Sequence, residues 1–118
     1  MLKLANAFSL NMLGENVEEA SINVVKLTKQ NAGWFLRQVG EFQSYVGHPD
    51  TAAILTQELG VEVKPNRETM KLDAGDVLVV AQYVGPRLPE GCRTLPEGAR
   101  FVYYSITLDI VILGSQTE

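Results

Sequence analysis

The stretch VLVVAQYV at residues 77–84 decides the fold class. It is nearly continuous in apolar residues and rich in Val and Tyr, which is typical of a central strand that is buried on both faces. Farther along, the side chains of residues 100–113 alternate with a period of two, and this pattern predicts a long strand. The sequence therefore predicts a core strand at 77–84 and a second strand at 100–113 that ends the fold.

The segment between these strands, residues 85–98, is rich in Pro and Gly and repeats the tetrapeptide Leu-Pro-Glu-Gly at 88–91 and 95–98. Such residues interrupt regular structure, so the segment is predicted to be a loop. Loops that leave a rigid sheet are where functional groups usually lie. We therefore expect part of any functional site in this segment.

Upstream of the core strand, capping residues and apolar patterns predict helices that alternate with strands. We expect Thr28 to cap a helix that runs through residue 39, and Pro49 to be the first residue of a helix that ends before Gly60. Ser9 predicts the cap of a short helix through residue 13. Strands are predicted at residues 3–8, 20–27 and 41–46, and short extended segments at 61–63 and 69–72.

Helices and strands interleaved in this way indicate an α/β sandwich, with a mixed sheet of about five strands flanked by helices. The chain has 118 residues, a mass of 13.0 kDa and 46% hydrophobic residues, which is enough for one hydrophobic core and too little for two. We therefore expect a single domain over residues 1–118, in which residues 114–118 form a flexible tail.

The net charge of −4 and the isoelectric point near 5.0 argue against a protein that coats long nucleic acids through a broad basic face. A small anionic ligand remains compatible, because a few arginines and a helix N-terminus can hold several phosphates. No apolar run reaches the roughly 20 residues of a membrane helix, and the N-terminus has no signal-peptide pattern. We expect a cytoplasmic protein with no membrane partner.

Cys92 and His48 are the only cysteine and the only histidine in the chain. One cysteine excludes an intrachain disulfide and a thiolate cluster, and one histidine excludes a zinc site built from several imidazoles of one chain. Carboxylates alone could still hold a metal ion, but the sequence has no motif for such a site. We expect neither a metal nor another cofactor.

Polar side chains that could carry chemistry gather at the predicted strand ends and in the predicted loops. The candidates are Asn6, Ser9 and Asn11 at the first strand-to-helix corner, His48 before the helix that starts at Pro49, Arg67 in a polar turn, and Arg87 and Glu90 in the loop after the core strand. Each has a simpler interpretation when taken alone. Ser9 would cap a helix, His48 would be a turn residue, and Arg87 with Glu90 would be a solvated charge pair.

The four groups together, in this order, resemble the viral anti-CRISPR and CRISPR-associated ring nucleases that degrade cyclic tetra-adenylate. The resemblance rests on LANAFSLNML at 4–13, GH and DT at 47–48 and 50–51, NR at 66–67, and RL and EG at 87–88 and 90–91. It covers about residues 2–91. Beyond this range, residues 92–99 form a connection that contains Pro and Gly, where viral members of the family have a helix.

The resemblance implies a two-fold homodimer that holds the cyclic ligand across its subunit interface and cuts it without a metal into linear di-adenylates. The products would end in a 2′,3′-cyclic phosphate or a 3′-phosphate, and cleavage would switch off type III CRISPR signalling. One His48 per subunit would protonate each of two leaving oxygens, since imidazole titrates near neutral pH. Arg87 and Arg67 would hold phosphate oxygens. Asn6, Ser9 and Asn11 would position the substrate, and Glu90 would orient the ribose 2′-hydroxyl or Arg87.

Two functions of other classes remain open. The same pocket could capture a cyclic nucleotide without cleaving it, or the chain could be a protein-interaction module of a virus or mobile element. In the second case the final strand, rich in Tyr and Val, would serve as a sheet edge or a dimer surface.

Overall fold

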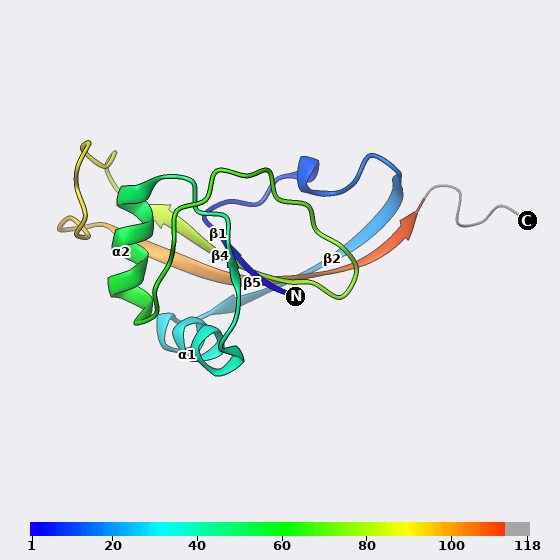
Figure 1. Cartoon of the computed structure of the whole chain (residues 1–118), viewed down its shortest axis with the longest axis horizontal. Coiled ribbons are helices and arrows are strands. Elements are labelled where there is room, and N and C mark those ends of the chain that lie inside the picture. The colour runs from blue at the N-terminus through cyan, green and yellow to red at the C-terminus, as the bar shows by residue number, and fades with distance from the viewer. Residues whose placement is uncertain (113–118) are drawn as a thin grey trace, which may run out of the picture.

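The computed structural model describes residues 1–112, so the tail predicted at 114–118 lies outside the described residues. Five strands form one mixed sheet in the order β2-β5-β4-β1-β3 (Figure 1). Their bounds are β1 (Leu2–Ala5), β2 (Val17–Leu27), β3 (Gln43–Ser44), β4 (Val77–Val84) and β5 (Arg100–Ile112). The centre of the sheet is β4, which pairs in parallel with β1 and antiparallel with β5. The predicted α/β class, the mixed sheet of about five strands and the core strand at 77–84 are confirmed.

Both predicted long helices are present, with the predicted bounds: α1 (Lys29–Val39) and α2 (Pro49–Leu59). The Thr28 hydroxyl accepts the N–H of Asn31 and so caps α1, whereas Gly60 ends α2 with a left-handed φ of 70°. The two helices approach closely at Gly33, where a Cβ atom would lie 2.8 Å from the carbonyl oxygen of Leu59. A glycine in the middle of α1 therefore serves the packing of α1 against α2.

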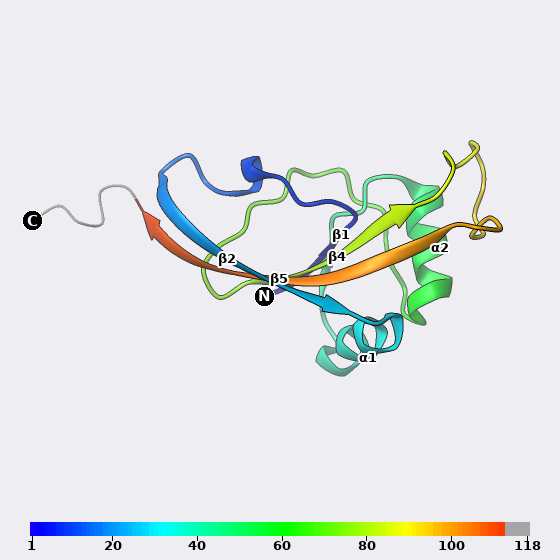
Figure 2. The same cartoon turned by 180° about the vertical axis from the view of Figure 1, so that it is seen from behind.

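The two faces of the sheet are covered differently. On one face, α1 and α2 share a hydrophobic cluster with alternate strand residues, among them Leu4, Val79 and Tyr103. On the other face, strand residues such as Leu78, Val80 and Ile106 pack against two segments. One is η1 (Leu10–Met12), a short 3-10 helix, and the other is the chain around Met70 and Leu72, which has no regular secondary structure. Figure 2 shows α1 and η1 on opposite sides of the sheet. Both α-helices thus lie on the same face.

A buried ion pair lies at the start of β1. The ammonium of Lys3 donates to the Asp76 carboxylate at 2.8 Å and to the carbonyl oxygen of Lys71 at 2.6 Å, and both charged side chains are 9% exposed. Burial disfavours ionisation of Asp76, but the N–H of Asp73 and the Lys3 ammonium outweigh it, so the pKa of Asp76 lies below its ordinary value. This contact ties β1 to the turn before β4.

Several predicted strand bounds are wrong. The first strand ends at Ala5 instead of reaching residue 8, the third has only two residues instead of the range 41–46, and neither 61–63 nor 69–72 forms a strand. At β3 the side-chain amide of Asn66 donates to the carbonyl oxygen of Ser44, and Val46 makes only a single bridge with Pro65. Side-chain hydrogen bonds thus replace a regular ladder at this edge.

The final strand is as long as predicted over its described part. It pairs with β4 over residues 100–107 and with β2 over residues 103–112, so a two-stranded ribbon extends beyond the sheet (Figure 1). The expectation that this strand is a sheet edge is wrong for residues 103–107, which have a neighbouring strand on each side. The outer strand is β2. Among the described residues, no helix is long and apolar enough to cross a membrane.

Candidate functional site

The candidate site lies where β1 and β4 end. Because these strands are parallel, their carboxyl ends meet at one edge of the sheet, and the N-terminus of α2 lies at the same edge. A hollow of about 1040 Å³ opens there. It is lined by residues from three segments of the chain: Asn6, His48, Asp50, Thr51, Tyr83, Gly85, Arg87, Leu88, Pro89 and Glu90. Four of the seven sequence-predicted residues, Asn6, His48, Arg87 and Glu90, therefore share one hollow.

His48 is the N-cap of α2, where its ring replaces the usual hydroxyl or carboxylate cap. Its Nδ1 atom accepts the backbone N–H of Asp50 at 3.2 Å, and its side chain is 57% exposed. An Nδ1 atom that accepts a hydrogen bond carries no proton. The tautomer that fits this hydrogen bond has its proton on Nε2, so Nε2 is the ring atom left to contact a ligand.

Arg87 and Glu90 reach the hollow from the loop that follows β4. The loop starts at Gly85, whose φ of 152° and close approach to Ala99 leave no room for a side chain. The Tyr83 phenol donates to the carbonyl oxygen of Pro86 at 2.5 Å and fixes the first turn of the loop. Both Arg87 and Glu90 are exposed, and within residues 1–112 neither side chain makes an ion pair or a hydrogen bond. Their polar atoms are thus available to a ligand.

Asp50 holds this loop against α2, a role that was not predicted from the sequence. Its carboxylate accepts the backbone N–H of Gly91 at 2.7 Å and the Arg93 Nε–H at 3.1 Å. The hydrogen bond from Gly91 outweighs partial burial, and together with Arg93 it keeps the pKa of Asp50 below its ordinary value. The signal in the sequence was the DT pair at 50–51, close to His48, whereas the partners of Asp50 are 41 and 43 residues away.

Arg67 lies beside the hollow instead of within it. Its Nε–H donates to the carbonyl oxygen of Gly47 at 3.1 Å, and it lines a neighbouring hollow of about 400 Å³ that also includes His48. The imidazole therefore stands between the two hollows. A ligand that extends past His48 would reach the guanidinium of Arg67.

The structure does not place Ser9 and Asn11 on the wall of the 1040 Å³ hollow. Their side chains hydrogen-bond to each other at the start of η1, and both residues are exposed. The Lys71 ammonium donates to the carbonyl oxygen of Asn11 at 3.0 Å and holds η1 to the chain before β4. Contact with a ligand in the hollow would require a ligand that reaches η1.

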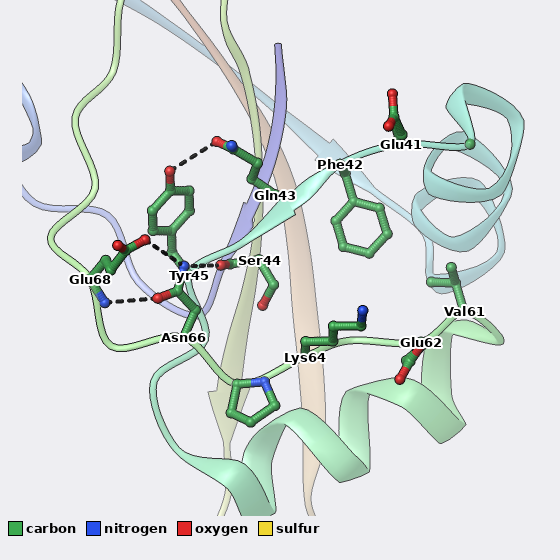
Figure 3. Close-up of a pocket in the computed structure, with 12 residues that line it drawn as sticks. Glu41, Phe42, Gln43, Ser44, Tyr45, Val61, Glu62, Lys64, Asn66 and Glu68 are labelled. Carbon is green, nitrogen blue, oxygen red and sulfur yellow. Dashed lines mark hydrogen bonds between the residues drawn. The ribbon is translucent and has the colours of Figure 1, made fainter.

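A second hollow, of about 550 Å³, lies along β3 and the chain after α2 (Figure 3). Figure 3 shows Glu41, Glu62 and Glu68 around it, with Lys64 as the single cation among the labelled side chains. Neither His48 nor Arg87 lines this hollow. Its carboxylates would repel phosphate groups, so it is a poor candidate for an anionic ligand.

Comparison with known proteins supports the fold described above. A family model described as STIV B116-like matches residues 2–98. Among solved structures, B116 of Sulfolobus turreted icosahedral virus (STIV) is similar to this chain, with a TM-score of 0.73 and 24% sequence identity. The similarity covers 90% of this chain and 97% of that chain. No curated protein matches the sequence.

Proposed function

The chain belongs to the STIV B116-like family, and we propose that it is a metal-independent ring nuclease that cleaves cyclic tetra-adenylate into two linear di-adenylates. The observation that carries the proposal is the meeting of His48, Arg87 and Glu90 in one hollow. An imidazole that can donate a proton from Nε2 once it is charged, an unpaired guanidinium and an unpaired carboxylate are the groups that cleavage of a phosphodiester by its own ribose needs.

The proposed reaction uses a nucleophile of the substrate. A ribose 2′-oxygen attacks the adjacent 3′-phosphorus and loses its proton to solvent, the bond from phosphorus to the 5′-oxygen breaks, and the charged imidazolium of His48 gives its Nε2 proton to that oxygen, leaving a neutral ring. A 2′,3′-cyclic phosphate and a 5′-hydroxyl result, and hydrolysis of the first would give a 3′-phosphate. Arg87 stabilises the charge on the phosphoryl oxygens, and Arg67 does the same on the far side of the His48 imidazole. Glu90 orients the 2′-hydroxyl or Arg87.

The size of the hollow supports a ligand of several nucleotides. Pockets for drug-sized ligands enclose about 300–1,000 Å³, and the 1040 Å³ hollow, together with the neighbouring one at Arg67, exceeds this range. Asn6 lines the hollow at the end of β1 and would bind a ribose or phosphate group. Ser9 and Asn11 would bind the part of the ligand that reaches η1.

We further propose a homodimer, in which two hollows face the two scissile bonds of one ring. The outer strand β2 supports association, because Ile22, Val24 and Val25 expose 37–53% of their surface along it. The cellular consequence of cleavage would be loss of the cyclic activator of type III CRISPR defence, to the benefit of a virus or mobile element in the host cytoplasm.

The test is incubation of the protein with cyclic tri-, tetra- and hexa-adenylate in excess EDTA, followed by chromatography and mass analysis. We expect cyclic tetra-adenylate to become di-adenylates with the ends named above, and the protein to be a dimer by light scattering under the same conditions. If cyclic tetra-adenylate is bound but stays intact, the protein is a sequestering module and not a nuclease. Cleavage that needs added Mg²⁺ or Mn²⁺ would overturn the metal-free mechanism.

A further inference from the structure

The proposed acid and the proposed phosphate ligand lie on separate segments, and Asp50 joins these segments. Its residue surface is 8% exposed, and each of its carboxylate oxygens is engaged: Oδ2 accepts the N–H of Gly91 and Oδ1 accepts the Nε–H of Arg93. Arg87 and Glu90, by contrast, are exposed side chains of the same loop. A carboxylate held in this way is a fixed point of the site.

The same carboxylate lies beside the His48 ring. Its Oδ2 atom is 4.0 Å from Nδ1, the ring nitrogen that now accepts the backbone N–H of Asp50. In a doubly protonated ring Nδ1 carries a proton, so it can no longer accept that hydrogen bond and needs an acceptor of its own. A small rotation of the ring would bring Nδ1 to the Asp50 carboxylate.

We propose, on the basis of the function proposed above, that Asp50 is the positioning residue of the site. It holds the loop of Arg87 and Glu90 against α2, and it accepts the Nδ1–H of His48 when the imidazole is charged. During cleavage the Nε2 proton passes to the leaving 5′-oxygen. The ring is then neutral with its remaining proton on Nδ1, held by Asp50, until a proton from solvent restores Nε2.

Other charged groups surround His48, and they differ from Asp50. Arg87 and Glu90 line the same hollow as the imidazole, and Arg67 and Glu68 line the neighbouring one. Arg93 faces the opposite carboxylate oxygen of Asp50. Among these groups, Asp50 is the one that is buried and held by two hydrogen bonds, so its carboxylate keeps a fixed position beside the imidazole.

The first experiment does not depend on nuclease activity. Because the chain has a single histidine, ¹⁵N NMR of the free protein reports the tautomer and the titration of His48 without overlap. In the parent protein we expect the neutral ring to carry its proton on Nε2. In Asp50→Asn the titration should shift to lower pH, since an opposite charge within about 4–6 Å favours the charged ring. Asp109→Asn, which removes an exposed carboxylate on β5, should leave it unchanged.

A neutral ring protonated on Nδ1, or a His48 titration that is the same in Asp50→Asn and in the parent, would overturn the proposal. Should Asp50→Asn fail to fold, as judged by thermal unfolding, the same titration of Arg93→Gln decides. Removal of the guanidinium leaves the Asp50 carboxylate free to accept the Nδ1–H of the imidazole. The His48 titration should then shift to higher pH, and an unchanged titration would again overturn the proposal.

The second experiment asks whether Asp50 acts through His48 during cleavage. At saturating cyclic tetra-adenylate, Asp50→Asn should lower the single-turnover rate by roughly 10- to 100-fold. Added to His48→Asn, the same change should cost clearly less than it costs the parent, because only the effect through the loop of Arg87 and Glu90 remains. Equal losses in the two backgrounds would contradict the inference. Absence of cleavage by the parent would instead refute the proposed nuclease and leave the NMR result to judge Asp50.

Discussion

The imidazole of His48 accepts the backbone N–H of Asp50 at 3.2 Å, so the candidate catalytic ring also caps helix α2. One side chain thus serves both the fold and the site. Removal of the ring would disturb both, and a loss of activity in an alanine variant would not by itself identify a catalytic role. A substitution that keeps the cap and removes the acid separates the two effects.

His48→Asn is that substitution, since Asn is among the best N-cap residues and has no titrating group. We expect His48→Ala to lower the free energy of unfolding by about 1 kcal/mol and His48→Asn to lower it by less than half as much. Urea unfolding of the two variants and the parent measures this difference. Equal losses in both variants would show that the ring does not act as a cap.

Gly85 is predicted to tolerate no side chain. Its φ of 152° is a conformation in which only glycine is common, and a Cβ atom there would lie 2.8 Å from the Ala99 Cβ atom. Gly85→Ala should lower the free energy of unfolding by about 2–3 kcal/mol. Gly75→Ala is the matched control, because Gly75 also has a positive φ but open space around it, and its cost should be about 1 kcal/mol. Equal melting temperatures for these variants would contradict the clash.

The buried pair of Lys3 and Asp76 predicts how stability depends on pH. Asp76→Asn leaves the Lys3 ammonium buried without its counter-charge and should cost about 3 kcal/mol at pH 7. The pKa of Asp76 is lowered in the folded protein, so its contribution is complete above the ordinary value of 3.8 and is lost as the pH falls through the lowered pKa.

Urea unfolding at pH 7 and at pH 3 or below checks this prediction. The difference in stability between the parent and Asp76→Asn should shrink in acid, whereas Asp109→Asn, an exposed change of the same kind, should match the parent at both values. A difference that is constant with pH would mean that the Asp76 charge does not stabilise the fold.

Short sequence patterns predicted the central strand and both α-helices, because these elements depend mainly on neighbouring residues. The apolar run at 77–84 gave β4, and the capping hydroxyl of Thr28 and the proline at residue 49 gave both α-helices. The short β3 could not be predicted from the sequence, because the Asn66 side-chain amide, 22 residues farther along the chain, donates to the carbonyl oxygen of Ser44. The placement of both α-helices on one face also depends on long-range contacts, such as that of Gly33 with Leu59.

The candidate site was predicted in the same uneven way. Asn6, His48, Arg87 and Glu90 lie together because the parallel strands β1 and β4 bring their carboxyl ends to one edge. The sequence predicted that these residues lie at strand ends and in loops, but it did not predict the parallel pairing. Asp50 was given no role, although it belongs to the DT pair at 50–51, because an acidic residue is ordinary in the first turn of a helix. Its partners Gly91 and Arg93 belong to a loop whose path no periodicity describes.

Arg87 is predicted to act on binding as well as on cleavage, because it holds phosphate that is charged before the reaction begins. Arg87→Ala should weaken equilibrium binding of cyclic tetra-adenylate by roughly tenfold or more and should make the affinity less sensitive to salt. Lys64→Ala is the control, since it removes a cation that lines the separate hollow of Figure 3. An Arg87→Ala protein with parental affinity and salt dependence would remove Arg87 from the site.

The most direct test of the account is the single-turnover cleavage of cyclic tetra-adenylate by His48→Asn, with equilibrium binding of the same ligand measured in parallel. The variant keeps the helix cap and loses the proton donor, so the rate should fall by roughly 10²- to 10⁴-fold, while binding changes by less than about threefold. A His48→Asn protein that cleaves at the parental rate would contradict the assignment of His48 as the acid, and with it the proposed mechanism.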